Sequence, residues 1–121
     1  MNAFIDNPTV QLRHEAAPAD AVCLACNGRV DRETMLACLA THFQFPDCFG
    51  NNWDAAYDLL LDKVDALAVD TSWRFSSGSA VHTDPEAITS FLQLMQDLVD
   101  YASDRGIRLQ VELFLDSGEV D

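Results

Sequence analysis

Three aspartates recur at four-residue intervals in this sequence, Asp54, Asp58 and Asp62, within a segment whose pattern predicts a helix. Residues four apart lie one above the other on a helix, so the three carboxylates form a row. Like charges in that arrangement destabilise a helix by about 0.2–0.5 kcal/mol per pair. No Lys or Arg lies three or four residues from Asp54 or Asp58 to offset this repulsion. The row therefore predicts a cationic partner.

The same carboxylates could instead serve an enzyme, with Asp54 and Asp58 as an acid–base pair. General acid–base catalysis needs carboxylates that face a pocket and whose pKa values are separated. Two acids one turn apart on an exposed helix do not create such a pocket by themselves. We expect a protein that is not an enzyme and that uses these groups to bind another protein.

Composition favours a basic partner. The chain has 20 acidic against 7 basic residues, a formal net charge of −13. This charge repels nucleic acid and anionic membranes, and it attracts basic proteins over long range. With 121 residues, 49% of them hydrophobic, the sequence predicts one core-forming domain over residues 21–121. Residues 1–20 are predicted to form an N-terminal arm, which could instead add an edge strand.

The sequence predicts a cytoplasmic protein with reduced thiols. Residues 1–25 lack a cationic start followed by a long apolar segment, and no apolar stretch is long enough to span a bilayer. Cys23 and Cys26 form a C-x-x-C in a strand-like segment, where residues three apart point to opposite faces, which argues against a redox or zinc site. Neither a metal nor a cofactor is expected, because the histidines are isolated: His14, His42 and His82.

The first half of the chain predicts a strand and two helices. Residues 22–26 form an apolar run that ends at an Asn-Gly turn, which predicts a buried strand. Asp31 is suited to cap a helix that extends to Phe43. A second helix is expected after Gly50, with Asn51 as its N-cap and Asp54 at the third position, where it could complete a capping box. The core-facing stripe of this helix consists of Trp53, Ala56, Tyr57 and Leu60.

The second half predicts a strand over residues 66–69, a connection over residues 70–83, a long helix and a final strand. Asp84 and Pro85 mark the start of the helix and Gly106 its end. The polar side of this helix, expected to be solvated, carries Ser90, Gln93, Asp97, Asp100 and Asp104. Alternating residues over 107–113 predict a strand with one buried face. Crossover connections of this kind give an α/β fold, here a three-stranded parallel sheet with the helices packed mainly on one side.

The segment between the first two predicted helices is similar to a known signature. It reads Pro46-Asp47-Cys48-Phe49-Gly50-Asn51-Asn52-Trp53-Asp54-Ala55-Ala56-Tyr57-Asp58. It resembles the barstar-type ribonuclease inhibitors, in which a Pro-acid-aromatic-aromatic-Gly-x-Asn loop leads into an x-Asp-Ala-x-aromatic-Asp helix. The resemblance covers about residues 22–115, more loosely toward the end, and it implies a barstar-like fold.

The resemblance also implies a function. In that family the loop and helix plug the active site of a basic, secreted microbial ribonuclease, and the carboxylates occupy the place of RNA phosphate. Carried over by position, Asp58 is the acid inserted deepest and Asp54 a second contact. Asn52 and Gly50 are loop contacts, and Tyr57 is the aromatic beside the key acid.

The late helix and the loop aromatics complete the implied site. Asp97 and Asp100 both compete for the acid that the family places on its late helix. Phe49 is the second loop aromatic, whereas Cys48 stands where the family has the first, and Tyr57 stands where it has tryptophan. These two departures predict a different target preference on the same fold.

Two alternatives accompany this hypothesis. A barstar-like module could bind a basic partner other than a ribonuclease, for instance a DNA-binding protein. The chain is expected to be a monomer, although an apolar rim of Cys48, Phe49 and Tyr57 could pair weakly with itself.

Overall fold

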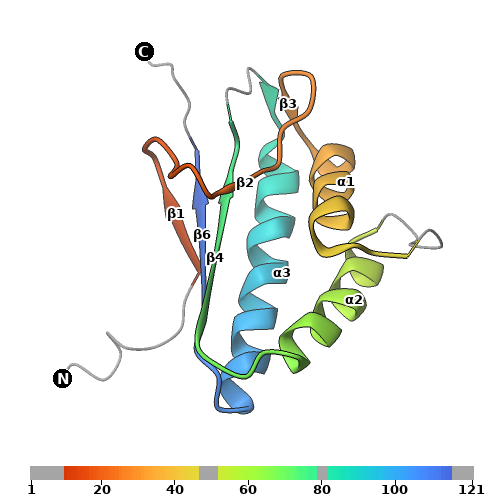
Figure 1. Ribbon diagram of the computed structural model, residues 1–121. Coiled ribbons are helices and arrows are strands. Elements are labelled where there is room, and N and C mark those ends of the chain that lie inside the picture. Colours follow the sequence, from red (N-terminus) through yellow and green to blue (C-terminus); the bar gives the residue numbers. More distant parts are fainter. Residues whose placement is uncertain (1–9, 47–51, 79–81, 116–121) are drawn as a thin grey trace.

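The computed structural model describes residues 10–46, 52–78 and 82–115, and it has an α/β fold of three helices and six strands in these ranges (Figure 1). The elements in chain order are β1 (Val10–Arg13), β2 (Val22–Cys23), β3 (Arg29–Val30), α1 (Arg32–Phe43), α2 (Trp53–Asp65), β4 (Thr71–Ser76), β5 (His82–Thr83), α3 (Pro85–Asp104) and β6 (Leu109–Phe114). None of the described helices is both long and apolar enough to cross a membrane.

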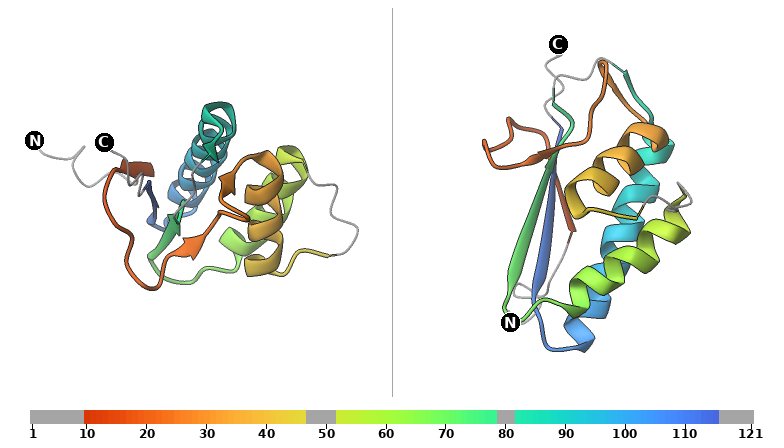
Figure 2. Two further views of the ribbon diagram at one scale, coloured as in Figure 1. Left: turned by 90° about the horizontal axis from the view of Figure 1, so that it is seen from above. Right: turned by 45° about the vertical axis from the view of Figure 1, so that its right-hand side comes forward.

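The main sheet is parallel and has the strand order β1-β6-β4-β2. The helices lie on one side of it, as predicted (Figure 2). The sheet has four strands rather than the expected three, because β1, from the segment predicted as an arm, pairs with β6 along the edge. A separate pair of two-residue strands, β3 and β5, was not predicted.

The predicted strand over residues 66–69 is wrong. Ala66 caps α2 by donating its backbone N–H to carbonyls of the last turn, and Leu67 closes the turn with a hydrogen bond to the carbonyl of Val64. Val69, in the following loop, is 68% exposed. The strand is β4, inside the segment predicted as a connection, where Thr71, Trp73 and Phe75 alternate with exposed polar residues in the register of β6.

The predicted starts of the first and third helices are confirmed. Asp31 caps α1 and forms a capping box with Thr34, whose backbone N–H lies 3.0 Å from Asp31 Oδ1. Asp84 caps α3, with Pro85 in its first turn. Gly106 follows α3 with φ of 83°, a conformation that favours glycine.

The core lies between the sheet and the helices. α3 packs on β6 and β1, α1 packs on β2 and β3, and α2 packs on α1 and α3. The amphipathic α3 supplies eight buried residues, among them Phe91, Met95 and Leu98. α2 is therefore held by the other helices, and its outward side carries the aspartate row.

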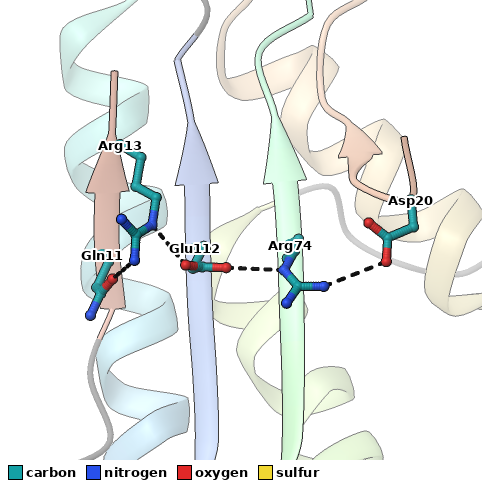
Figure 3. A network of polar contacts seen from close by, with 5 residues as sticks. All are labelled: Gln11, Arg13, Asp20, Arg74 and Glu112. Atoms are coloured by element: carbon teal, nitrogen blue, oxygen red, sulfur yellow. Dashed lines mark hydrogen bonds and ion pairs between the residues drawn. The ribbon is translucent and has the colours of Figure 1, made fainter. Parts of the chain in front are cut away.

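A polar network links the strands on the outward side of the sheet (Figure 3). Glu112 of β6 accepts hydrogen bonds from Arg13 Nε at 2.7 Å and from Arg74 Nε at 3.0 Å. Arg74 also pairs with Asp20, and Arg13 contacts Gln11. Burial alone would raise the pKa of Glu112, but the hydrogen bonds and charges of the two arginines outweigh it and lower that pKa. The network ties β1, β6 and β4 together.

Candidate protein-binding groove

The start of α2 sets the direction of its first side chains. Asn52 is the N-cap, and its Oδ1 accepts a hydrogen bond from the backbone N–H of Ala55 at 2.8 Å. The expected cap was Asn51, so the prediction is shifted by one residue. Asp54 is consequently the second residue of the helix rather than the third, and its capping-box interpretation is wrong. Asp54 still lies in the first turn, where the helix dipole favours a carboxylate.

The aspartate row is exposed. Asp54, Asp58 and Asp62 are all solvent-exposed on α2, and none of them forms an ion pair among the described residues. Ala56 and Leu60 are fully buried on the opposite side, while Trp53 and Tyr57 are half-buried. The helix thus presents uncompensated negative charge to solvent while its other side holds it to the core.

A groove of about 460 Å³ separates the first half of α2 from α3. One wall is formed by Trp53, Asp54 and Tyr57 of α2. The other wall is formed by five residues of α3, namely Thr89, Ser90, Gln93, Leu94 and Asp97. The groove therefore has carboxylates on both walls, with aromatic and hydroxyl side chains between them.

Asp97 and Asp100 have different surroundings. Asp97 lines the groove, and its Oδ1 accepts a hydrogen bond from Gln93 Nε2 at 3.1 Å. Asp100 is bonded in the same way to Gln96, also at 3.1 Å, and is not among the groove-lining residues. The structure thus brings Asp97, and not Asp100, to the groove that Asp54 lines.

Tyr57 lies between acids of α2 and α3. Burial raises the pKa of its phenol, and the negative charges of Asp97 and then Asp58 raise it further. Asp97 lines the same groove as Tyr57, and Asp58 follows Tyr57 directly in the chain. At neutral pH the phenol keeps its proton and can donate a hydrogen bond into the groove.

The far ends of α2 and α3 are joined by a second cluster. Tyr101 Oη donates a hydrogen bond to Asp65 Oδ1 at 2.8 Å, and Arg105 Nε lies 3.0 Å from the same oxygen. Arg105 also lies over the ring of Tyr101, 5.6 Å from its centroid. These contacts hold the C-terminal ends of the helices together, while the groove lies toward the other end of α2.

Of the remaining predicted contacts, one lies among the described residues and three lie outside them. Asn52 is described and caps α2, whereas Cys48, Phe49 and Gly50 lie outside the described residues. The sequence places Ser90 and Gln93 on a solvated helix face, whereas both side chains line the groove. Trp53 was assigned to the core; it packs partly against the core and also lines the groove.

Comparison with known proteins identifies the family. No curated protein and no solved structure matched the chain. The family model described as Barstar (barnase inhibitor) matches residues 19–114, which include α2, α3 and the whole groove. This match spans well over half of the 121 residues of the chain. The chain therefore belongs to the Barstar (barnase inhibitor) family.

Proposed function

We propose that this protein inhibits a basic microbial ribonuclease by placing the acidic side of α2 and α3 in the enzyme's active site. The observation that carries the proposal is the groove whose opposite walls hold Asp54 and Asp97. A ribonuclease active site must neutralise RNA phosphates with cationic side chains. Carboxylates that occupy the positions of those phosphates would exclude the substrate.

The groove has side chains that can bind a single arginine of the partner. Carboxylates bind a guanidinium through charge-assisted hydrogen bonds, and an aromatic face binds it by a cation–π interaction. Asp54 and Asp97 supply the first kind of contact, while Trp53 and Tyr57 supply the second. An arginine from the ribonuclease is therefore the preferred occupant, ahead of a lysine, whose ammonium is a point charge.

Asp58 is proposed as the central acid. It is exposed, it lies one turn beyond Asp54 on α2, and its charge acts on Tyr57. An exposed carboxylate without a compensating ion pair in the described structure remains available to cations of the partner. Family resemblance adds Asn52 and the loop residues Cys48, Phe49 and Gly50 as further contacts, and Asp100 as a peripheral acid near Asp97.

Association with such an enzyme would be driven by charge. The net charge of −13 attracts a basic protein from a distance and steers the encounter. The proposed site has no catalytic role: its carboxylates act as fixed negative charges. A monomeric cytoplasmic inhibitor that protects its host cell from a secreted ribonuclease fits these properties, and in that sense the protein would be antitoxin-like.

A pull-down from the source cell tests the proposal. The immobilised wild-type protein is compared with an Asp54→Ala/Asp58→Ala/Asp97→Ala variant. This variant removes two acids that line the groove and the exposed Asp58, and it leaves the buried core unchanged. A basic protein retained only by the wild type, and able to cleave RNA until the inhibitor is added, is the expected result. A retained basic protein without ribonuclease activity would replace this proposal with a binding module for another partner.

A further inference from the structure

The main sheet has an open stretch of edge along β4. β6 pairs with all six residues of β4, whereas β2 pairs only with Phe75 and Ser76 near its end (Figure 1). Beside residues 71–74, no further strand lies on the β2 side within the described part of the chain. A strand edge with unpaired backbone groups is a template for pairing with another chain.

The backbone of this stretch presents hydrogen-bond donors to the open side. The N–H of Thr71 is bonded to the carbonyl of Arg108, 2.9 Å away, and so faces β6. Two backbone directions alternate along a strand, and the carbonyl of Ser76 accepts a bond of 2.8 Å from the β2 side. Ser72 and Arg74 share the direction of Ser76. Their N–H groups therefore face the open edge, and no described residue accepts a hydrogen bond from them.

A cleft of about 120 Å³ lies along the same edge. One side of it is formed by four consecutive residues of β4, namely Ser72, Trp73, Arg74 and Phe75. Consecutive side chains of a strand point to opposite faces, so a single cleft can touch all four only along the edge of the strand. The other side is formed by His42 and Phe43 at the end of α1, and by Asp20 and Val22.

The cleft has room for one apolar side chain. A cavity of about 150 Å³ in a protein can hold a benzene molecule. The rings of Phe43 and Trp73 lie 5.0 Å apart, and Phe45 stacks on Phe43 at 6.4 Å. Trp73 is only partly buried against the core. An apolar group that covers these aromatic rings would gain the free energy of removing them from water.

The charges around the cleft indicate what kind of chain would fit. The side chain of Asp20 is 71% exposed and pairs with Arg74 at 3.5 Å. Arg74 also pairs with Glu112, so two carboxylates already compensate its charge. His42 is the other basic side chain that lines the cleft. The net charge of −13 repels a second copy of the protein and attracts a basic chain.

We propose that the open edge of β4 is a second protein-binding site, which takes an extended segment of a basic partner as an added strand. The segment accepts hydrogen bonds from the N–H groups of Ser72 and Arg74. It places one apolar side chain in the cleft and a Lys or Arg beside Asp20. In strand addition, main-chain hydrogen bonds supply affinity and pockets for side chains supply specificity. The cleft shares no lining residue with the inhibitory groove, so this site does not depend on ribonuclease inhibition.

Selection from a displayed library of random seven-residue peptides tests the proposal. Peptides are selected on the immobilised wild-type protein after those that bind a Ser72→Pro variant have been removed. Proline at this position removes the edge donor, and it costs no hydrogen bond to β6 because the N–H of Ser72 faces the other way. The expected peptides combine an apolar residue with Lys or Arg. No enrichment over Ser72→Pro, or enrichment of acidic peptides, would overturn the proposal.

The most enriched peptide is then synthesised and measured against matched variants. Ser72→Ala keeps the backbone donor and should bind like the wild type, whereas Ser72→Pro should bind at least about tenfold more weakly. Asp20→Asn should also weaken binding, because it removes the exposed carboxylate. Each variant is used only if its circular dichroism and melting temperature match those of the wild type. Equal binding by all three variants would exclude the edge of β4 as the site.

Two further measurements locate the peptide and identify the occupant. Amide hydrogen exchange at Ser72 and Arg74 of the wild type should slow when the peptide binds, a result that needs no proline variant. An Asp54→Ala/Asp97→Ala variant should bind the peptide unchanged, and loss of binding there would place the peptide in the groove instead. Sedimentation velocity examines the protein alone. A dimer that Ser72→Pro abolishes would mean that the edge pairs with a second copy, which would overturn the basic partner.

Discussion

Asp54 of α2 and Asp97 of α3 line opposite walls of one groove. These two aspartates are more than forty residues apart in the sequence. Each is positioned locally. Asn52 caps the helix whose first turn carries Asp54, and Asp97 accepts a hydrogen bond from Gln93. A cation that enters the groove can therefore meet a carboxylate on each wall.

The first prediction separates the two acids of the late helix. Asp97→Ala should weaken binding of the ribonuclease by about 1–3 kcal/mol, since it removes a carboxylate that lines the groove. Asp100→Ala is the matched control, because Asp100 has the same kind of glutamine partner but does not line the groove. Its effect should stay below about 1 kcal/mol, as expected for a peripheral charge. Calorimetric titration of both variants measures the difference, and the reverse order would exclude the groove as the contact site.

The second prediction concerns ionic strength. If carboxylates of one protein meet cations of the other, the association rate constant should fall steeply as salt rises, while the dissociation rate constant changes little. Stopped-flow association at low and at physiological ionic strength provides this measurement. An association rate that does not depend on salt would remove the phosphate-mimic mechanism.

The third prediction concerns target choice. Tyr57 replaces a tryptophan of the family signature and Cys48 a loop aromatic, so both positions offer less rigid apolar contact area. We expect tighter binding to the ribonuclease of the source organism than to barnase, with the double substitution Cys48→Tyr/Tyr57→Trp improving inhibition of barnase. Titration of both enzymes with both proteins tests this. If barnase inhibition does not improve, specificity resides elsewhere, in α3 or in the N-terminal segment.

The fourth prediction concerns the pH dependence of folding. The two arginines lower the pKa of Glu112 in the folded protein. Its carboxylate therefore contributes stability that is complete above its unfolded pKa, about 4.3, and that is lost as pH falls through the lower folded pKa. Glu112→Gln should be less stable than the wild type at pH 7, and the gap should close in acid.

Urea unfolding from pH 7 down to pH 3 provides the free energies for this comparison. Glu15→Gln is the control, since Glu15 is exposed and lies outside the network. A Glu112→Gln deficit that is the same at pH 7 and pH 3 would mean that the charge of Glu112 contributes nothing and that only packing was lost.

The helices were predictable because their signals are local. Asp31, Asp84 and Pro85 act within one turn of the helices they start, and Gly106 acts directly after the helix it follows. The edge strand β1 could only be offered as an alternative, because its pairing partner β6 lies about a hundred residues away in sequence. The sequence does not predict β4, because polar residues alternate with its apolar ones. The apolar run Leu67-Ala68-Val69 resembles a strand, but it lies in the loop between α2 and β4.

The groove was only partly predictable. The acids of α2 were visible as a repeat, since their spacing puts them in one row. Whether Asp97 or Asp100 lines the groove depends on how α3 packs against α2. No local sequence signal encodes this packing. In the sequence alone, Gln93 looks like a solvated helix residue. Its place in the groove follows only from the packing of α2 beside α3.

The most direct test of the account is ribonuclease inhibition by two single variants of the aspartate row. Asp58→Ala should weaken inhibition by at least about 2 kcal/mol, as loss of a central charged contact does, whereas Asp62→Ala, near the end of α2, should change it by less than about 1 kcal/mol. Folding of Asp58→Ala should be unchanged or slightly stabilised, because repulsion within the row is relieved. The measurement is the inhibition constant of each protein against the purified target. Full inhibition by Asp58→Ala, at the concentration at which the wild type inhibits, would contradict the account.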